Sequence, residues 1–161
     1  MGRRKYPGAR GLIEQTRGGV LALVALFLPI AVLCVGIVVD LGTVFFVRKA
    51  VQAACDLGAL AGVQELDWDL LAVGHVAVRV DDVERIAVEV ARENLESVEL
   101  LVPELQITAK AENPPAREDP VVSVEAVYTV RTPFLRSVPG LGRGFQGRVT
   151  AEASVVKRTK W

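Results

Sequence analysis

The stretch "VLALVALFLPIAVLCVGIVVDLGTVFFVRKAVQAACDLGALAG", residues 20–62, decides the fold. Residues 20–39 carry no charge, and a helix of that length spans about 30 Å, the thickness of the hydrocarbon core of a bilayer. Beyond Asp40 the chain is free of proline until Pro103. The stretch therefore predicts one long helix, made of a transmembrane helix at 20–39 and a helical stem at 40–66.

Composition and charge agree with a membrane segment. The chain has 161 residues, of which 51% are hydrophobic, and its mean hydropathy is +0.35, which exceeds the soluble average. Basic residues dominate the first 19, which predicts a cytoplasmic basic tail at 1–19 and an extracytoplasmic remainder. A cleaved secretory signal is the alternative. The apolar run is long for a signal and no A-x-A site follows it, which favours a retained anchor.

The stem carries a stripe of small side chains. Ala50, Ala54, Gly58 and Gly62 recur every four residues, and so lie on one face of a helix. Such a stripe lets a second helix approach closely. A freely solvated stem gains nothing from this, so the pattern predicts packing, either in a helical bundle or against the chain's own domain.

A second stripe of the stem is polar. Arg48, Gln52 and Asp56 also recur every four residues and can contact one another. They form either the solvated face of the helix or a set that fixes the register of packed helices. Asp40, at the lipid boundary, is expected to neutralise a positive group of a neighbouring helix. The residues expected to pack or assemble are Asp40, Gly42, Arg48, Gln52, Ala54, Asp56, Gly58, Ala61 and Gly62.

Residues 67–161 predict an α+β domain. Apolar residues at helical spacing predict an amphipathic helix over 81–98 with an N-cap at Asp81 or Asp82, and weak alternation suggests a short strand at 75–80. Alternating residues then predict one antiparallel sheet packed on the helix. Its expected strands are 105–112, 121–132 and 147–158. The apolar residues of loop 133–146 either cap the sheet or form a partner-binding edge.

Catalytic and metal-binding patterns are missing from the sequence. His75 is the only histidine, which excludes a histidine-based triad, and no P-loop, GxGxxG or GxSxG occurs. We therefore expect no enzyme activity, cofactor, metal, nucleic acid or small-molecule substrate. Cys34 and Cys55 would lie about 31 Å apart in one helix and cannot bridge. Both are expected to be unpaired thiols, with an intermolecular disulfide at Cys55 as the alternative.

Residues 18–62 resemble the N-terminal region of TadG-like and TadE-like proteins of Flp (Tad) pilus systems. That region pairs an RG-x-V start and an apolar span containing proline with a "VDLG…R…LQ-A-A-DAAALAGA" pattern. Cys55 and Gly58 depart from it. The matching positions are Arg17, Gly18, Pro29, Asp40, Gly42, Arg48, Gln52, Ala53, Ala54, Asp56, Ala59, Leu60, Ala61 and Gly62.

The resemblance implies a function in pilus assembly. It implies a pilin-like domain outside the cytoplasmic membrane, a single-pass anchor in membrane lipid, and partners among pilin-like or Tad assembly proteins that contact the stem. The glycine–glutamate spacing of a prepilin-peptidase site is absent after Gly19, and 161 residues leave no room for a von Willebrand-type domain. The resemblance therefore implies a structural or assembly component, pseudopilin-like or minor pilin-like, that acts by helix packing, and the alternative is a membrane-anchored extracytoplasmic binding module unrelated to pili.

Overall fold

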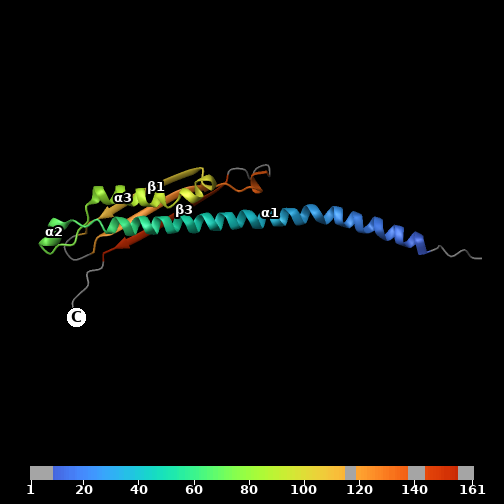
Figure 1. Cartoon of the computed structure of the whole chain (residues 1–161), viewed down its shortest axis with the longest axis horizontal. Coiled ribbons are helices and arrows are strands. Elements are labelled where there is room, and N and C mark those ends of the chain that lie inside the picture. The colour runs from blue at the N-terminus through green and yellow to red at the C-terminus, as the bar shows by residue number, and fades with distance from the viewer. Residues whose placement is uncertain (1–8, 115–118, 138–143, 156–161) are drawn as a thin grey trace, which may run out of the picture.

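The computed structural model describes residues 9–114, 119–137 and 144–155. Helix α1, Ala9–Val63, runs unbroken through Pro29 for 55 residues. Its N-terminal part extends away from the rest of the protein, and its C-terminal part lies along a small domain (Figure 1). Gly19–Val63 is long and apolar enough to cross a membrane, judged by length and composition.

The domain consists of a three-stranded sheet and one long helix beside α1. The strands are antiparallel in the order β1-β2-β3, and α1 and α3 pack on them, α1 mostly on β2 and β3 and α3 on β1 (Figure 1). This confirms the predicted α+β class. The elements after α1 are α2 Trp68–Ala72, α3 Val80–Glu93, η1 Glu96–Leu101, β1 Glu104–Glu112, β2 Val121–Val130, η2 Leu135–Ser137 and β3 Phe145–Ser154.

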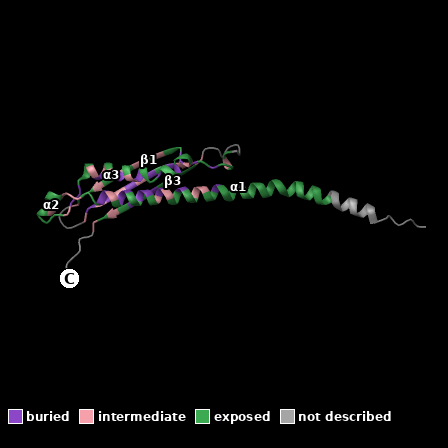
Figure 2. Ribbon diagram, in the orientation of Figure 1, coloured by how far each residue is buried: buried purple, intermediate pink, exposed green. Residues whose placement is uncertain are grey.

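The core lies between the sheet and the two helices. In β2, buried residues alternate with more exposed ones, so that Val122, Val124 and Tyr128 all point towards α1 and α3. Val47 and Val51 of α1 belong to the same buried cluster. Burial along α1 is consequently one-sided over the domain and nearly absent before it (Figure 2).

The predicted helix over 81–98 is shorter than expected and differs at both ends. It begins at Val80 after an N-cap at Arg79 that makes no side-chain capping bond, so Asp81 and Asp82 lie in the first turn instead, where they favour the helix dipole. Asn94 stops the helix because its side-chain amide donates a hydrogen bond to the carbonyl of Val90, at 2.8 Å. The chain then tightens into η1.

The short strand predicted at 75–80 is wrong. Only an isolated bridge forms there, between Leu66 and Val78. Both backbone groups of Val78 bond to the side chain of Asn113, which accepts from the N–H at 2.9 Å and donates to the carbonyl at 2.8 Å. Because the side chain of Asn113 satisfies both backbone groups of Val78, these groups do not need a partner strand. The one-turn helix α2, capped by Asp67, was not predicted.

The three later strands are present, with shifted ends. The first runs over Glu104–Glu112, the second ends at Val130 rather than at 132, and the third starts at Phe145 and ends at Ser154. Within the predicted loop 133–146, residues 135–137 form η2. Residues 138–143 of that loop and 156–158 of the predicted last strand lie outside the described residues.

Candidate functional site

The buried side of α1 faces the protein's own domain. We call it the inner face. Because its members recur every three or four residues, they form one continuous strip that contacts the sheet and α3. The inner face consists of the buried residues of α1, namely Gly36, Asp40, Val47, Val51, Ala54, Cys55, Gly58, Ala59, Gly62 and Val63.

Two glycines of the inner face make the closest approach to α3. A Cβ at Gly58 would lie 2.5 Å from the carbonyl oxygen of Ala87, and one at Gly62 would lie 3.1 Å from both Val83 and Val122. These distances leave no room for a side chain at Gly58. The predicted small-residue stripe thus packs against the chain's own domain, which was one of the two options left open, and not on a surface free for another helix.

The other small residues of the stem differ in burial. Ala54 is buried in the core, whereas Ala50 and Ala61 are half-buried at its margin. Gly42 lies on the opposite side of α1, where an added Cβ would meet no atom within 4 Å. Of the expected packing residues, Gly42 is therefore turned away from the domain.

The polar stripe is only partly solvated. Gln52 donates hydrogen bonds to Asp56 Oδ1 at 3.0 Å and to the carbonyl of Thr150 in β3 at 3.3 Å. Arg48 and Asp56 are exposed. Gln52 therefore joins α1 to the edge strand of its own sheet, and only Arg48 and Asp56 present charges to the outside.

Asp40 is fully buried at the end of the apolar run. One carboxylate oxygen accepts the N–H of Phe134 at 3.1 Å, and the other accepts the N–H of Leu135. Asp40 was expected to meet a positive group on a neighbouring helix. Its partners are instead backbone amides at the start of η2, 94 and 95 residues further along the same chain.

Cys55 is also fully buried in the inner face. Burial, and to a smaller degree the charge of Asp56, raises the pKa of its thiol to about 11. A disulfide to another chain needs an accessible thiolate, so the buried position argues against the intermolecular bond considered from the sequence. Cys34 lies in the apolar run and is exposed.

The side of α1 opposite the domain is exposed and largely apolar. We call it the outer face. Phe46 is 60% exposed, Leu57 46% and Leu60 52%, far more than these side chains usually are in a soluble domain. The small-residue spacing of the stem gave no signal for these large residues. The outer face consists of Gly42, Phe45, Phe46, Lys49, Ala53, Leu57 and Leu60.

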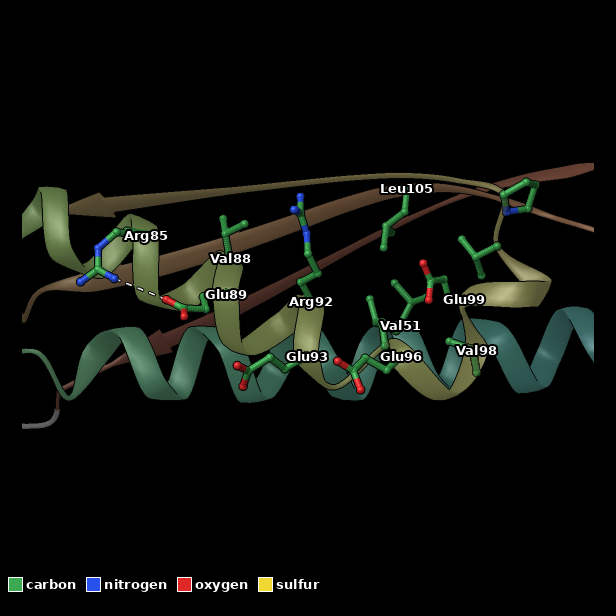
Figure 3. Close-up of a pocket in the computed structure, with 13 residues that line it drawn as sticks. Val51, Arg85, Val88, Glu89, Arg92, Glu93, Glu96, Val98, Glu99 and Leu105 are labelled. Carbon is green, nitrogen blue, oxygen red and sulfur yellow. Dashed lines mark hydrogen bonds and ion pairs between the residues drawn. The ribbon is translucent and has the colours of Figure 1, made fainter.

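A groove of about 690 Å³ opens between α1, α3, η1 and β1 (Figure 3). Apolar side chains such as Val88, Val98 and Leu105 lie along it. Its remaining lining is charged and mainly acidic, and Arg85 pairs with Glu89 at 3.4 Å. The charged lining residues are Arg85, Glu89, Arg92, Glu93, Glu96 and Glu99.

The described residues offer no constellation of metal ligands. Among them, no group of three or more His, Cys, Asp or Glu side chains is placed to hold a metal ion. His75 is exposed in the turn after α2.

Comparison with known families agrees with the region singled out in the sequence. Residues 18–65 match the family model Tad, "Putative Flp pilus-assembly TadE/G-like". The match covers the apolar run and the stem, which confirms the resemblance there and points to Flp pilus assembly. Neither the comparison with curated proteins nor that with solved structures gives a match.

Proposed function

Because its first helix matches a family of Flp pilus-assembly TadE/G-like proteins, we propose that this protein is a structural component of a Flp (Tad) pilus, either a minor pilin or a pseudopilin-like assembly subunit. It acts by helix packing and not by catalysis. Its partners are membrane lipid around residues 20–39 and the helices of other pilin-like or Tad assembly proteins around the stem.

The proposed topology follows from the charges that flank the apolar run. Arg3, Arg4, Lys5, Arg10 and Arg17 precede it, and the helix continues beyond it into the domain. The positive-inside tendency puts the N-terminus in the cytoplasm and the domain outside the cytoplasmic membrane. In this topology the stem and the domain are available to a filament on the outer side.

The outer face is the single observation that carries the proposal. An apolar helix face is normally buried. Past Asp40, α1 carries large apolar residues on its inner and outer faces, with the polar stripe between them, yet its own domain covers only the inner face. Phe46, Leu57 and Leu60 would expose apolar area to water in an isolated chain, and helices of other subunits would remove that area from water.

The outer face, and not the small-residue stripe, is therefore the proposed assembly surface. Gly42, at its membrane end, allows the close approach that a small residue permits. Arg48 and Asp56, the two exposed charges of the polar stripe, flank the outer face and are positioned to set register with a neighbour. Ala54, Gly58, Ala61 and Gly62 serve assembly indirectly because they hold the domain on α1.

Shearing of cells that produce the Leu57→Gln/Leu60→Gln variant tests this proposal. We expect the wild-type chain in the sheared filament fraction, or in the membrane fraction cross-linked to a Tad component. The double variant should lose both associations while keeping its steady-state level. Gln106→Leu/Thr108→Leu, on the solvent side of β1, is the matched control. A double variant that behaves like the wild type would contradict an assembly role of this surface.

The groove supports a second candidate, a membrane-anchored binding module that uses the external domain. Its apolar lining and its four glutamates suit a basic, partly apolar peptide from an envelope protein. Glu93→Gln/Glu96→Gln would weaken such binding without affecting filament association. If this variant fails in vivo while Leu57→Gln/Leu60→Gln functions normally, the binding-module alternative is favoured over the pilus proposal.

A further inference from the structure

The segment that leads into η2 is fixed against α1 at the level of the apolar run. The ring of Phe134 lies on Gly36, where an added Cβ would come within 2.9 Å of two ring carbons. One turn further along α1, the carboxylate of Asp40 accepts hydrogen bonds from the N–H groups of Phe134 and Leu135. Gly36 and Asp40 are also the only buried residues among residues 19–40 of α1.

This contact sets the depth of Phe134 relative to a membrane. Gly36 lies within the uncharged run 20–39, about 6 Å along the helix axis from Asp40. The headgroup and interfacial layer of one leaflet is about 5–8 Å thick. If residues 20–39 span the bilayer, the ring of Phe134 must therefore lie at the boundary between headgroups and acyl chains.

We infer that residues 131–136 form a second membrane contact, in which Phe134 inserts at the bilayer interface and Arg131 and Arg136 meet phospholipid phosphates. The inference rests on the membrane span of the proposed function. It adds that the domain rests on the bilayer surface and is not held clear of it. The occupant is the lipid interface itself, and no protein partner is needed.

The chemistry of the segment suits that occupant. Phe134 is 47% exposed although it packs on Gly36, and Pro133 is exposed beside it. Arg131 and Arg136 are exposed on either side of the apolar residues. Apolar insertion flanked by basic side chains is the combination that holds peripheral segments at anionic membranes. The carboxylate of Asp40 is buried and is held by two amide donors, so it is not exposed to the lipid phosphates.

The sheet brings one more aromatic side chain to this end of the domain. Phe145, 46% exposed, pairs with Val130, directly before Arg131. Thr150, further along β3, is level with Gln52 of α1. Because β3 rises about 3.4 Å per residue, Phe145 lies about 17 Å nearer the membrane than Thr150. It therefore approaches the level of Asp40, close to the proposed contact.

Quenching of tryptophan fluorescence by brominated lipids tests the inference on the full chain. Phe134→Trp is placed in a W68F/W161F background and reconstituted in phosphatidylcholine vesicles, with lipids brominated either near the headgroup or near the chain end. We expect at least twofold stronger quenching by the shallow bromines than by the deep ones. Pro133→Trp is a second reporter that leaves Phe134 on Gly36, and it should also respond to the shallow bromines.

Two controls separate failure of the inference from failure of its premise. Leu28→Trp, in the middle of the span, should be quenched by the deep bromines. The W161F protein keeps Trp68 as its one tryptophan, in α2 at the far end of the domain, and this residue should not be quenched at all. If Leu28→Trp is quenched and neither Phe134→Trp nor Pro133→Trp is, the second contact is overturned and the span stands. An unquenched Leu28→Trp would overturn the span and the inference together.

The two arginines have their own test. Adding phosphatidylglycerol to the vesicles should increase shallow quenching of Phe134→Trp, and Arg131→Gln/Arg136→Gln should abolish that increase. Quenching that is the same with and without phosphatidylglycerol in the parent protein would overturn the assignment of these arginines to lipid phosphates.

Discussion

Two glycines of α1 have opposite surroundings, and alanine substitution should have opposite effects on stability. At Gly58 the new Cβ meets the carbonyl oxygen of Ala87 at 2.5 Å, so α1 and α3 must move apart. We expect Gly58→Ala to lower the free energy of unfolding by about 1–3 kcal/mol. At Gly42 nothing lies within 4 Å, and Gly42→Ala should raise it by up to about 1 kcal/mol.

Urea unfolding of the full chain in detergent micelles measures both effects. The Gly42→Ala variant serves as the matched control, because it makes the same chemical change in the same helix. Equal stabilities for the two variants would contradict the packing of α1 on α3. Comparing Gly42→Ala with Gly58→Ala in cells separates an effect on assembly from an effect on folding, since Gly42 belongs to the outer face and Gly58 to the inner face.

Asp40 should hold the start of η2 on α1. Asp40→Ala removes the acceptor of two backbone amides, and a hydrogen bond to a charged group contributes about 1.5–3 kcal/mol. Hydrogen exchange should accelerate at the amides of Phe134 and Leu135 and stay unchanged in the strands. Asp56→Ala, which removes an exposed acid from another face of α1, is the control. Unchanged exchange at Phe134 would show that the contact does not exist in the membrane-bound protein.

The buried thiol of Cys55 should make stability depend on pH in the alkaline range. Its pKa rises from 9.0 to about 11 on folding, so the folded state holds the proton more tightly than the unfolded state. The stabilisation is fully present below pH 9 and is lost as the pH rises towards 11. Burial also raises the pKa of Tyr128, an effect that Arg48 partly offsets, so Tyr128 contributes in the same direction.

The comparison of wild type with Cys55→Ala isolates the thiol. The urea midpoint of the wild type should fall more steeply between pH 9 and pH 11 than that of the variant, which retains the Tyr128 contribution. Parallel pH profiles would show that Cys55 is accessible to solvent in the folded chain. The same burial predicts slow alkylation of Cys55 at neutral pH.

At the scale of elements, Asn113 is expected to hold the connection between α1 and α3. Its side-chain amide replaces a strand partner for both backbone groups of Val78. Asn113→Ala should cost about 1–3 kcal/mol because it leaves a buried donor and acceptor unpaired. Asn94→Ala, at the exposed end of α3, should cost less. Chemical denaturation of both variants measures the difference, and an equal cost would contradict a special role for Asn113.

Periodicity predicted the elements better than their ends. The strands of 105–112 and 121–132 and the long helix were visible because side-chain period depends only on local chain geometry. The early end of α3 depends on one hydrogen bond of Asn94, and the missing strand at 75–80 on the distant Asn113. Pairings of this kind depend on the tertiary fold and have no local signal.

The function of the two faces of α1 could be predicted only in part. The small-residue stripe predicted close helix packing, but spacing alone cannot say whether the second helix belongs to the same chain, as α3 does at Gly58. Asp40 was expected to meet a positive group on a neighbouring helix, whereas its partners are amides 94 and 95 residues further along its own chain. The outer face was missed because Phe46, Leu57 and Leu60 become exceptional only once the other side of α1 is known to be covered.

At the scale of the whole molecule, α1 serves as anchor, domain scaffold and proposed assembly surface. The inner face is occupied along the stem by the domain, and the outer face continues the apolar surface of the membrane run. Subunits that pack through the outer face would line up their α1 helices with the domains on the outside. The bilayer contact proposed for Phe134 would fix the height of each subunit before it joins such an array.

Site-specific photo-cross-linking in cells tests this account most directly. A photoreactive side chain is placed at Phe46, Leu57 or Leu60 on the outer face, with Gln106 on the solvent side of β1 as the control. We predict adducts with another pilin-like or Tad subunit from the outer face and none from Gln106. Adducts from Gln106 but none from the outer face would contradict the central claim that this surface of α1 joins the chain to its partners.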